Sequence, residues 1–265
     1  MQLANVSRSS ARLDWRGTDL EPEASVRAYY QALMEAWGPQ DWWPAYTRFE
    51  VIVGAFLTQN TAWTNVERAL RRLRDEGACN VDGIRRTPLA KLAKMIRSSG
   101  YFRQKARRLK TFVDYLDARY GGSLERMFAQ PTDKLREELL ALNGVGPETA
   151  DSILLYAGGH PVFVVDAYTR RIFERHELIT AKSRYEDLRQ LVERAFQQAH
   201  PAVLDQPPTS PLPGRRRHKF VIRRGTPTAH AFDEFHALLV QAAKHHCLKA
   251  EAKCAGCPLE RFLKK

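Results

Sequence analysis

Apolar side chains recur every three or four residues along most of the chain, which is the period of an amphipathic α-helix. The segment 48–61 is almost wholly apolar and fits a buried strand as well as a buried helix, but its helical neighbours favour a helix. Only the short segment 160–165 is expected to be extended. The pattern predicts an all-α protein, with helices within 24–37, 48–61, 62–77, 88–100, 104–122, 131–142, 166–178 and 231–247.

A pair of glycines marks a tight turn between the helix at 131–142 and a second helix that begins at Pro147. The stretch LNGVGPETAD, residues 142–151, places Gly144 and Gly146 on either side of Val145, directly before Pro147. Glycine accepts left-handed backbone torsions cheaply, and proline suits the first turn of a helix. Backbone N–H groups at such a turn can bind an anion such as a phosphate, but an ordinary helix–helix turn explains the same pattern.

The chain is strongly basic. It has 42 Lys and Arg against 30 Asp and Glu, a net charge of +12 and a pI of about 9.7. This balance favours a polyanionic partner such as nucleic acid, although a solvated basic surface gives the same balance. No apolar run reaches the ~18–20 residues of a membrane span, and residues 1–17 lack the apolar core of a secretion signal. We therefore expect a cytoplasmic protein without a membrane partner.

Two further segments depart from the helical pattern. Residues 201–229 are rich in proline and contain a basic run at 215–219, which predicts an irregular insertion that serves as a solvated linker or, less readily, follows a nucleic-acid backbone. Cys79 stands alone, whereas Cys247, Cys254 and Cys257 cluster near the end of the chain. Such a cluster suits a metal site in a reducing compartment better than a disulfide framework.

The stretch LNGVGPETADSILLYAGGHPVFVVDAYTRRI, residues 142–172, resembles the helix-hairpin-helix segment and catalytic aspartate of the endonuclease III superfamily of base-excision DNA glycosylases. In that family the hairpin leads to a Val-Asp dipeptide whose aspartate enters the active site, and here Val165 and Asp166 hold that place. The resemblance implies a catalytic Asp166. By itself, the residue also suits the N-cap of a helix.

Two other stretches extend the resemblance, which covers about residues 24–200 and 230–262. FLTQNT, residues 56–61, is similar to a segment whose glutamine fills the gap left by an extruded base, which implies this role for Gln59. SGYFRQKARRL, residues 99–109, is similar to a Gly-aromatic-Lys-Ala segment at the DNA interface. The similarity implies phosphate contacts by Lys105 and Arg107, together with the amides of Gly144, Val145 and Gly146.

The family resemblance implies two helical domains on either side of a DNA-binding cleft. We expect residues 46–158 to form the inner domain with the helix-hairpin-helix motif. Residues 1–45 and 159–265 would form the terminal domain, which carries the cysteine loop and the insertion at 201–229. The expected partner is duplex DNA, bound by a monomer associated with the nucleoid.

The hairpin departs from the lyase branch of this family at one position. Lyases carry a lysine two residues after the second glycine, and that lysine forms a Schiff base with the sugar; here the residue is Glu148. A carboxylate cannot form an imine, so the resemblance implies a monofunctional glycosylase in which water attacks and Asp166 orients it or stabilises the sugar cation. Glu148 either faces the base pocket or favours the first turn of its helix, as acidic residues do.

Adjacent tryptophans give a clue to the substrate. Trp42 and Trp43, followed by a proline, resemble the 3-methyladenine glycosylase branch when combined with Glu148 and the two DNA-facing stretches. That branch excises alkylated purines, and a cationic N-alkylated purine stacks well on an indole and leaves readily. Both tryptophans are candidates to line the base pocket, although we expect one to lie in the core.

The cysteine loop departs from the family pattern as well. Cys247, Cys254 and Cys257 match the start of the family's iron–sulfur loop, but the position of its fourth cysteine holds Leu263. Three alternatives stay open. The loop binds a 4Fe-4S cluster with a stand-in ligand, or binds zinc through the three cysteines and either His245 or His246, or holds no metal.

These observations predict a monofunctional DNA glycosylase that hydrolyses the N-glycosidic bond of damaged, alkylated bases in duplex DNA. Two alternatives remain: an endonuclease III-like glycosylase for oxidised or mismatched bases, and a non-catalytic helix-hairpin-helix DNA-binding protein. The presence of Asp166 argues against the non-catalytic protein.

Overall fold

The computed structural model describes residues 21–40, 45–198 and 225–263, which are helical nearly throughout and contain no strand. The segment 48–61 is a helix rather than a strand over most of its length, as predicted. In chain order the elements are α1 Pro22–Trp37, α2 Arg48–Thr58, α3 Trp63–Asp75, α4 Val81–Arg86, α5 Leu89–Met95, η1 Arg97–Ser99, α6 Phe102–Tyr120, α7 Leu124–Phe128, α8 Thr132–Leu140, α9 Pro147–Ser152, η2 Ile153–Gly158, α10 Ala167–Arg175, α11 Tyr185–Gln197, α13 Pro227–His245 and η3 Glu260–Phe262.

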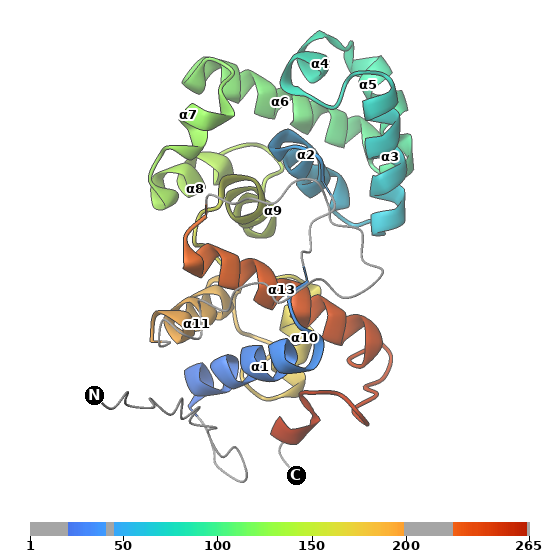
Figure 1. Cartoon of the computed structure of the whole chain (residues 1–265). Coiled ribbons are helices and arrows are strands. Elements are labelled where there is room, and N and C mark those ends of the chain that lie inside the picture. Colours follow the sequence, from blue (N-terminus) through green and yellow to red (C-terminus); the bar gives the residue numbers. More distant parts are fainter. Residues whose placement is uncertain (1–20, 41–44, 199–224, 264–265) are drawn as a thin grey trace, which may run out of the picture.

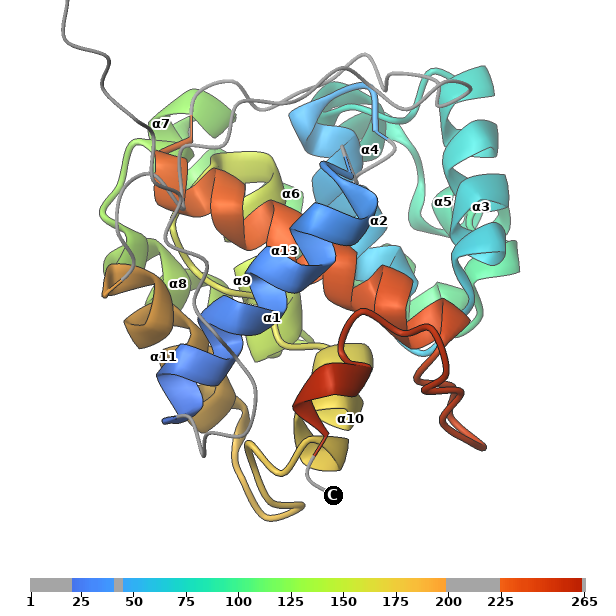
Figure 2. The ribbon, with the colours of Figure 1, turned by 60° about the horizontal axis from the view of Figure 1, so that its bottom comes forward.

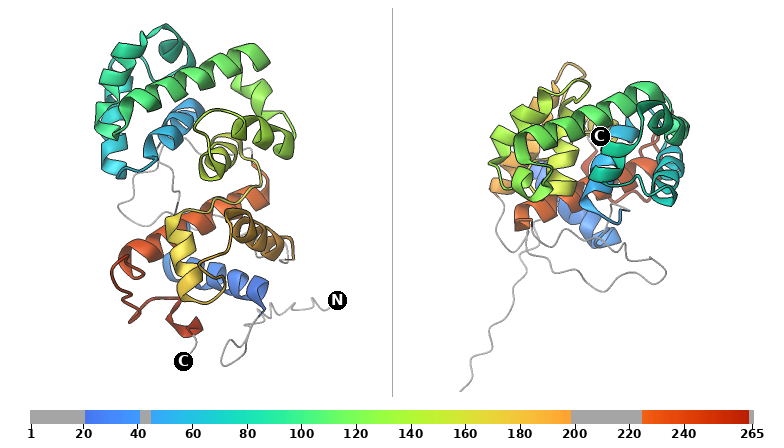
Figure 3. Two further views of the ribbon diagram at one scale, coloured as in Figure 1. Left: turned by 180° about the vertical axis from the view of Figure 1, so that it is seen from behind. Right: turned by 90° about the horizontal axis from the view of Figure 1, so that it is seen from above.

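The helices form two groups (Figure 1). Helices α2 to α9 make the upper group, in which α2 packs against α3, α6, α9 and η2. Helices α1, α10, α11 and α13 make the lower group, where α1 packs on α11 and α13 (Figure 2). The chain passes from the upper group to α10 through the segment 159–166 (Figure 3). The buried apolar residues form one continuous cluster through both groups, so the proposed domain boundaries remain a prediction.

Helix α2 forms the centre of the upper group. Its residues from Phe49 to Leu57 are all buried, which explains why this segment lacks a polar face. The Thr47 hydroxyl accepts a hydrogen bond from the Glu50 N–H at 3.1 Å and caps the N-terminus of the helix. Buried Glu50 forms an ion pair with Arg74 of α3. At the other end of the helix, the C-cap Gln59 lies beside the glycine turn and contacts Gly144.

The glycine turn joins α8 to α9, and only one of its glycines requires left-handed torsions. Gly144 has φ +81°, whereas Gly146 has φ −96° and forms the extended N-cap of α9. Our expectation that both glycines serve the torsions of the turn is therefore wrong for Gly146. A Cβ on Gly146 would meet no atom within 4 Å, so this residue leaves space beside the backbone. Pro147 occupies the first turn of α9, as predicted.

The chain after α9 contains a feature that the sequence pattern did not predict. Residues Ile153–Gly158 form a π-helix, an irregularity that is frequent at functional sites. The segment 160–165 is neither helix nor strand and bends at Pro161, and its residues Val162–Val165 are buried. That it is extended stays a prediction. This segment ends at Asp166, the N-cap of α10.

Other differences from the sequence prediction are helices that the periodicity did not mark and one boundary. Helices α4, α7 and α11 were not predicted individually. Residues 201–224 of the proposed insertion lie outside the described residues, and its last three residues belong to α13, which Thr226 caps through its hydroxyl at 3.1 Å from the Ala229 nitrogen. No helix in the described part of the chain is long and apolar enough to cross a membrane.

Candidate active site

Asp166 is the point at which α10, α13 and η2 meet. Its Oδ1 accepts a hydrogen bond from the Thr169 N–H at 2.7 Å, which confirms the predicted N-cap. Its Oδ2 lies 3.5 Å from Nε2 of His236 in α13, and Nδ1 of that histidine lies 2.6 Å from the hydroxyl of Tyr156 in η2. The Asp166 side chain remains 14% exposed, so one edge of the carboxylate faces solvent.

The surroundings favour the ionised form of Asp166. Burial alone would raise the pKa of its carboxyl group, but the charge and hydrogen bond of His236 and the Thr169 contacts hold this pKa below its usual value. Asp166 is therefore a carboxylate at neutral pH. A partly buried anion of this kind can attract positive charge that develops beside it.

Glu148 lies close enough to sense the charge of Asp166. Burial raises the pKa of the Glu148 carboxyl, the Asp166 charge raises it further, and His236 opposes the shift. Glu148 lies in the first turn of α9, where its side chain reaches solvent while the surrounding protein partly desolvates the carboxyl group. Its place in the first turn of α9 agrees with one interpretation, whereas a place in the base pocket stays a prediction. The carboxyl groups of Glu148 and Asp166 have pKa values displaced in opposite directions. Such pairs commonly divide the acid and base roles of an active site.

A buried network fixes the backbone that presents Asp166. Asp151 of α9 is fully buried and accepts hydrogen bonds from the Arg136 guanidinium at 2.7 and 3.1 Å and from the Tyr185 hydroxyl at 2.9 Å. The same hydroxyl accepts a hydrogen bond from the N–H of Val165 at 3.3 Å. Tyr185 of α11 thus connects the hairpin helix to the residue directly before Asp166.

Gln59 lies at the C-terminus of α2 beside the glycine turn. Its Nε2 donates to the Gly144 carbonyl at 3.1 Å and to the Thr149 hydroxyl at 2.9 Å, and its Oε1 accepts from Arg108. A Cβ on Gly144 would collide with the Arg108 guanidinium, so glycine allows this close approach. The structure therefore brings Gln59 to the hairpin, while its role in filling the gap in DNA stays a prediction.

Tyr101 was not singled out from the sequence, although it lies in the predicted DNA-facing stretch. Its ring is 68% exposed and its φ is +43°, an uncommon backbone conformation for a residue other than glycine. It directly precedes α6, on which Arg107 is exposed. An exposed aromatic ring on a basic face is suited to stacking against nucleic-acid bases.

Lys105 does not have the place that the sequence suggested. Its side chain is 1% exposed, and its ammonium donates to the carbonyls of Leu57 at 2.9 Å and Ser99 at 2.7 Å. Our expectation that Lys105 binds a phosphate is therefore wrong for this structure, because the charge is directed inward. Burial, together with the charge of Arg108, lowers the pKa of Lys105 to about 8.

Trp42 and Trp43 lie outside the described residues, but the residue that begins this segment is fixed. The Gln40 N–H donates to Oε2 of Glu234 at 2.5 Å, and Glu234 lies in α13 two residues before His236. The other flank, Ala45, is buried at the start of the upper group. Gln40, which precedes this segment, thus contacts the helix that holds His236.

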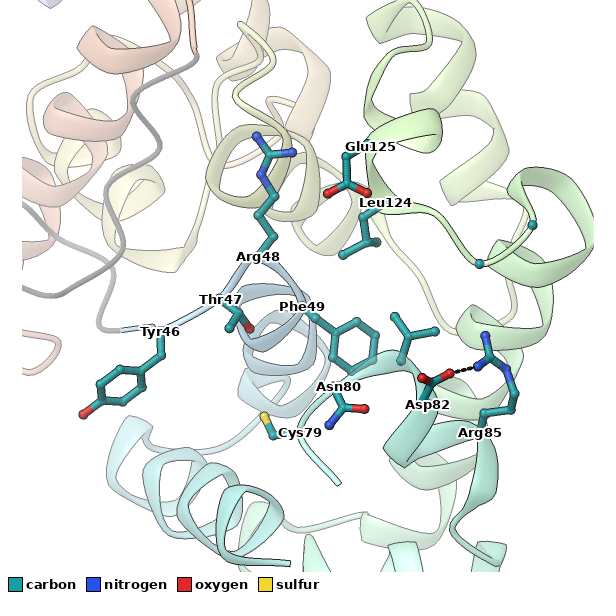
Figure 4. A pocket seen from close by; sticks show the side chains of 13 residues that line it. Tyr46, Thr47, Arg48, Phe49, Cys79, Asn80, Asp82, Arg85, Leu124 and Glu125 are labelled. Atoms are coloured by element: carbon teal, nitrogen blue, oxygen red, sulfur yellow. Dashed lines mark hydrogen bonds and ion pairs between the residues drawn. The ribbon is translucent and has the colours of Figure 1, made fainter. Parts of the chain in front are cut away.

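A separate cavity lies away from these residues. It has a volume of about 750 Å³ and is formed by the N-terminal ends of α2 and α4 and by α7, with Arg48, Asn80 and Arg85 among its lining residues (Figure 4). Neither Asp166 nor Glu148 lines it. Cys79 lies at its wall, where burial raises the pKa of the thiol to about 12.

The three clustered cysteines surround a separate cavity of about 230 Å³ in the lower group. Its lining residues include Cys247, Cys254 and Cys257, together with His176, His246 and Leu263. Burial and the two neighbouring thiols raise the pKa of Cys257. No set of three His, Cys, Asp or Glu side chains in the described part of the chain is arranged to hold a metal ion.

Comparison with known proteins identifies the family of this site. Residues 53–198 match the HhH-GPD superfamily of base excision DNA repair proteins. A protein of Methanocaldococcus jannaschii that carries the name of a DNA repair glycosylase is 39% identical over 237 residues, which cover 88% of this chain and 93% of that protein. Endonuclease III of Thermotoga maritima is 35% identical over 134 residues, or 48% of this chain and 55% of that enzyme.

Solved structures support the same assignment. The 3-methyladenine DNA glycosylase of H. pylori, bound to 1,N6-ethenoadenine, is 28% identical with a TM-score of 0.67 and covers 85% of this chain and 98% of that chain. An endonuclease III in a non-covalent complex with DNA shares the fold, with a TM-score of 0.66 at 19% identity over 91% of this chain and 95% of that chain.

Because Lys105 is buried, we expect its replacement to lower the free energy of unfolding. Leu57 lies in the last turn of α2, where its carbonyl lacks an intrahelical partner, so Lys105→Met should cost about 2 kcal/mol by leaving buried carbonyls unpaired. The pKa of Lys105 in the folded protein is about 8, below the usual 10.5. Between these two pH values, the unfolded chain therefore binds more protons at Lys105 than the folded protein does. The stability advantage of the wild type over Lys105→Met should therefore grow as pH rises from about 8 to 10.5.

Urea denaturation at several pH values measures this difference. Arg107→Met, an exposed change on the same helix, is the control and should leave stability unchanged while weakening DNA binding. A Lys105→Met variant of normal stability whose DNA binding depends less steeply on salt would instead support a direct phosphate contact.

Proposed function

Because the chain belongs to the HhH-GPD superfamily of base excision DNA repair proteins, we propose that it is a monofunctional DNA glycosylase that releases alkylated purines from duplex DNA. The observation that carries this proposal is the pair formed by Asp166 and Glu148. Asp166 is held ionised, and the hairpin residue that senses its charge is a carboxyl group instead of an amine. The site thus offers a charge for a cationic sugar but no lysine at this position to attack it.

In the proposed reaction, the bond between C1′ of the sugar and the base nitrogen breaks, and the base leaves with the electron pair. Asp166 stabilises the positive charge that develops on the sugar and directs a water molecule toward C1′. The proton released by this water passes to Asp166 or to solvent. His236 and Tyr156 hold the Asp166 carboxylate in place, because His236 contacts Oδ2 and is itself paired with Tyr156.

The substrate class is proposed from the charge of the leaving base. An N-alkylated purine is cationic, so it stacks on indole rings and needs little protonation before it leaves. Trp42 and Trp43 are the proposed pocket residues, and the fixed position of Gln40 beside α13 supports this assignment. The likeness to the H. pylori enzyme, which extends over nearly all of that chain, favours the same class.

Duplex DNA is proposed to approach along the hairpin, Gln59 and the start of α6. The backbone of Gly144, Val145 and Gly146 would contact phosphates, since no atom occupies the space where a Gly146 side chain would lie. Arg107 would add a phosphate contact from the exposed face of α6. The net charge of +12 supports such an interface.

A second candidate is excision of oxidised or mismatched bases. The identity with endonuclease III of Thermotoga maritima favours this class over about half of the chain. This second candidate gives Asp166 the same role as the first. It differs from the first in the base pocket and in the use of a lysine nucleophile. The two candidates therefore make different predictions for Glu148.

The first test of the mechanism is Asp166→Asn. We expect base release to fall by about 10²–10⁴-fold, because asparagine cannot supply the negative charge or accept a proton. Affinity for damaged duplex should stay within about tenfold, since phosphate contacts elsewhere fix the DNA. Asparagine is also a good N-cap, so α10 should remain folded.

Single-turnover base release and equilibrium binding to the same duplex separate these effects. Asp114→Asn, an exposed change on α6, is the control for loss of one negative charge and should keep normal turnover. An Asp166→Asn variant with near-normal turnover would remove Asp166 from the catalytic step.

The second test concerns the nucleophile and uses borohydride, which reduces an imine between enzyme and sugar to a permanent crosslink. The wild type should release its base without efficient trapping, and the abasic strand should stay intact until alkali is added. Glu148→Lys places an amine in the lyase position, where partial desolvation lowers its pKa and favours reaction. This variant should gain trapping on abasic DNA.

Two controls separate chemistry from charge. Glu148→Gln removes the carboxylate without adding an amine, and Glu137→Lys adds the same charge change at an exposed position of α8; neither should be trapped. Strong trapping of the wild type that disappears when another lysine is replaced would show that the protein is a lyase.

A further inference from the structure

Although no three side chains of the described residues form a site for a single metal ion, the cavity bounded by the cysteine loop is lined by the thiol donors that an iron–sulfur cluster uses. Three thiol groups line about 230 Å³ of space, several times the share of liquid volume taken by one water. A single tetrahedral zinc ion would instead draw its sulfur ligands to within about 4 Å of one another, given Zn–S bonds of about 2.3 Å. Cys247, Cys254 and Cys257 are thus the residues that would hold a cluster, and a cluster supplies one-electron chemistry and a structural link within the loop.

Leu263 leaves this set one ligand short, and a histidine that follows α10, His176, lines the same cavity. The Tyr29 ring packs against His176, with ring centroids 5.1 Å apart, and against Phe262 at 5.0 Å. Phe262 directly precedes Leu263, and both Leu263 and His176 line the cavity. His176 and Leu263 therefore line the same cavity, and the Tyr29 ring packs against both His176 and the neighbour of Leu263.

Tyr29 also prepares the His176 ring for metal binding. The Tyr29 hydroxyl lies 3.0 Å from Nδ1 of His176. In the tautomer with a proton on Nδ1, the ring donates this hydrogen bond to the Tyr29 hydroxyl. The lone pair of Nε2 is then available to bind a metal ion. A hydrogen bond on the second ring nitrogen is the usual companion of a metal-bound histidine.

We propose that His176 is the fourth ligand of a 4Fe-4S cluster in this protein, bound through Nε2 and completing the ligand set of Cys247, Cys254 and Cys257. A neutral imidazole in place of a thiolate makes the cluster less negative by one charge. The Arg175 guanidinium, which lies 3.2 Å from Sγ of Cys247, adds positive charge at another ligand. Both features favour the reduced cluster and predict a higher reduction potential than four cysteine ligands would give.

His246 is the competing ligand, and its surroundings differ from those of His176. Its ring stacks on Trp37, with centroids 6.0 Å apart, and its Nδ1 donates to the Lys253 carbonyl at 3.1 Å. It directly precedes Cys247, so it lies at a corner that already has a sulfur ligand. His246 is therefore the matched control for His176.

The test begins with full-length protein purified without oxygen and reconstituted with ferrous iron and sulfide. The wild type should contain about four iron atoms and four sulfides per chain and absorb broadly in the visible range. After reduction with dithionite, pulsed electron paramagnetic resonance should detect a strongly coupled nitrogen from the imidazole ligand.

Three variants identify the source of that nitrogen. His176→Cys should keep the cluster, lose the nitrogen coupling and lower the reduction potential, whereas His176→Ala should lose the coupling together with iron. His246→Ala should keep both the cluster and the coupling. Adding Leu263→Cys to His176→Ala should restore the iron content without the coupling.

The proposal is overturned by any of three results. The first is a coupling that persists in His176→Ala and disappears in His246→Ala. The second is a reconstituted wild type that lacks nitrogen coupling. The third is a protein that takes up stoichiometric zinc, or no metal, under conditions that load iron and sulfide into clusters. None of these results bears on base release, so this proposal fails or holds independently of the proposed function.

Discussion

The arrangement of the site depends on the ion pair and the hydrogen bond that the buried Asp151 carboxylate makes. This carboxylate lies on the hairpin helix, pairs with Arg136 of α8 and accepts a hydrogen bond from Tyr185 of α11. Tyr185 in turn holds the backbone at Val165, one residue before Asp166. Removing one partner of a buried ion pair costs about 3–5 kcal/mol because the other charge is left uncompensated. A single network therefore couples the orientation of the DNA-binding hairpin to the position of the carboxylate proposed to act in catalysis.

The opposite pKa displacements of the two carboxyl groups follow from the same architecture. Burial raises the pKa of both groups, but at Asp166 a histidine and a helix N-terminal N–H outweigh it, whereas at Glu148 a neighbouring negative charge adds to it. One group is thus kept ionised and the other is made easier to protonate. In the proposed mechanism this division suits a cationic leaving base, which needs an anion near the sugar more than it needs a strong acid near the base.

The sequence predicted those parts of the molecule that depend on local pattern. Helical periodicity gave the main helices, Pro147 marked the start of α9, and Asp166 was expected as an N-cap. The predictions that were wrong or missing concern residues whose positions depend on tertiary contacts. His236 lies 70 residues after Asp166 in the chain, and nothing in its own helix distinguishes it from other histidines. Lys105 carries the charge of a phosphate contact, but only the packing of α6 on α2 shows that its ammonium points inward.

The central claim is that water, rather than an enzyme amine, displaces an alkylated purine. It is tested most directly by incubating the protein with a panel of duplexes that each carry one damaged base, and by comparing strand cleavage before and after alkali. We expect cleavage only after alkali, with duplexes containing N-alkylated or etheno purines processed at least about tenfold faster than those with oxidised or mismatched bases. Release of oxidised bases accompanied by strand cleavage without alkali would contradict it.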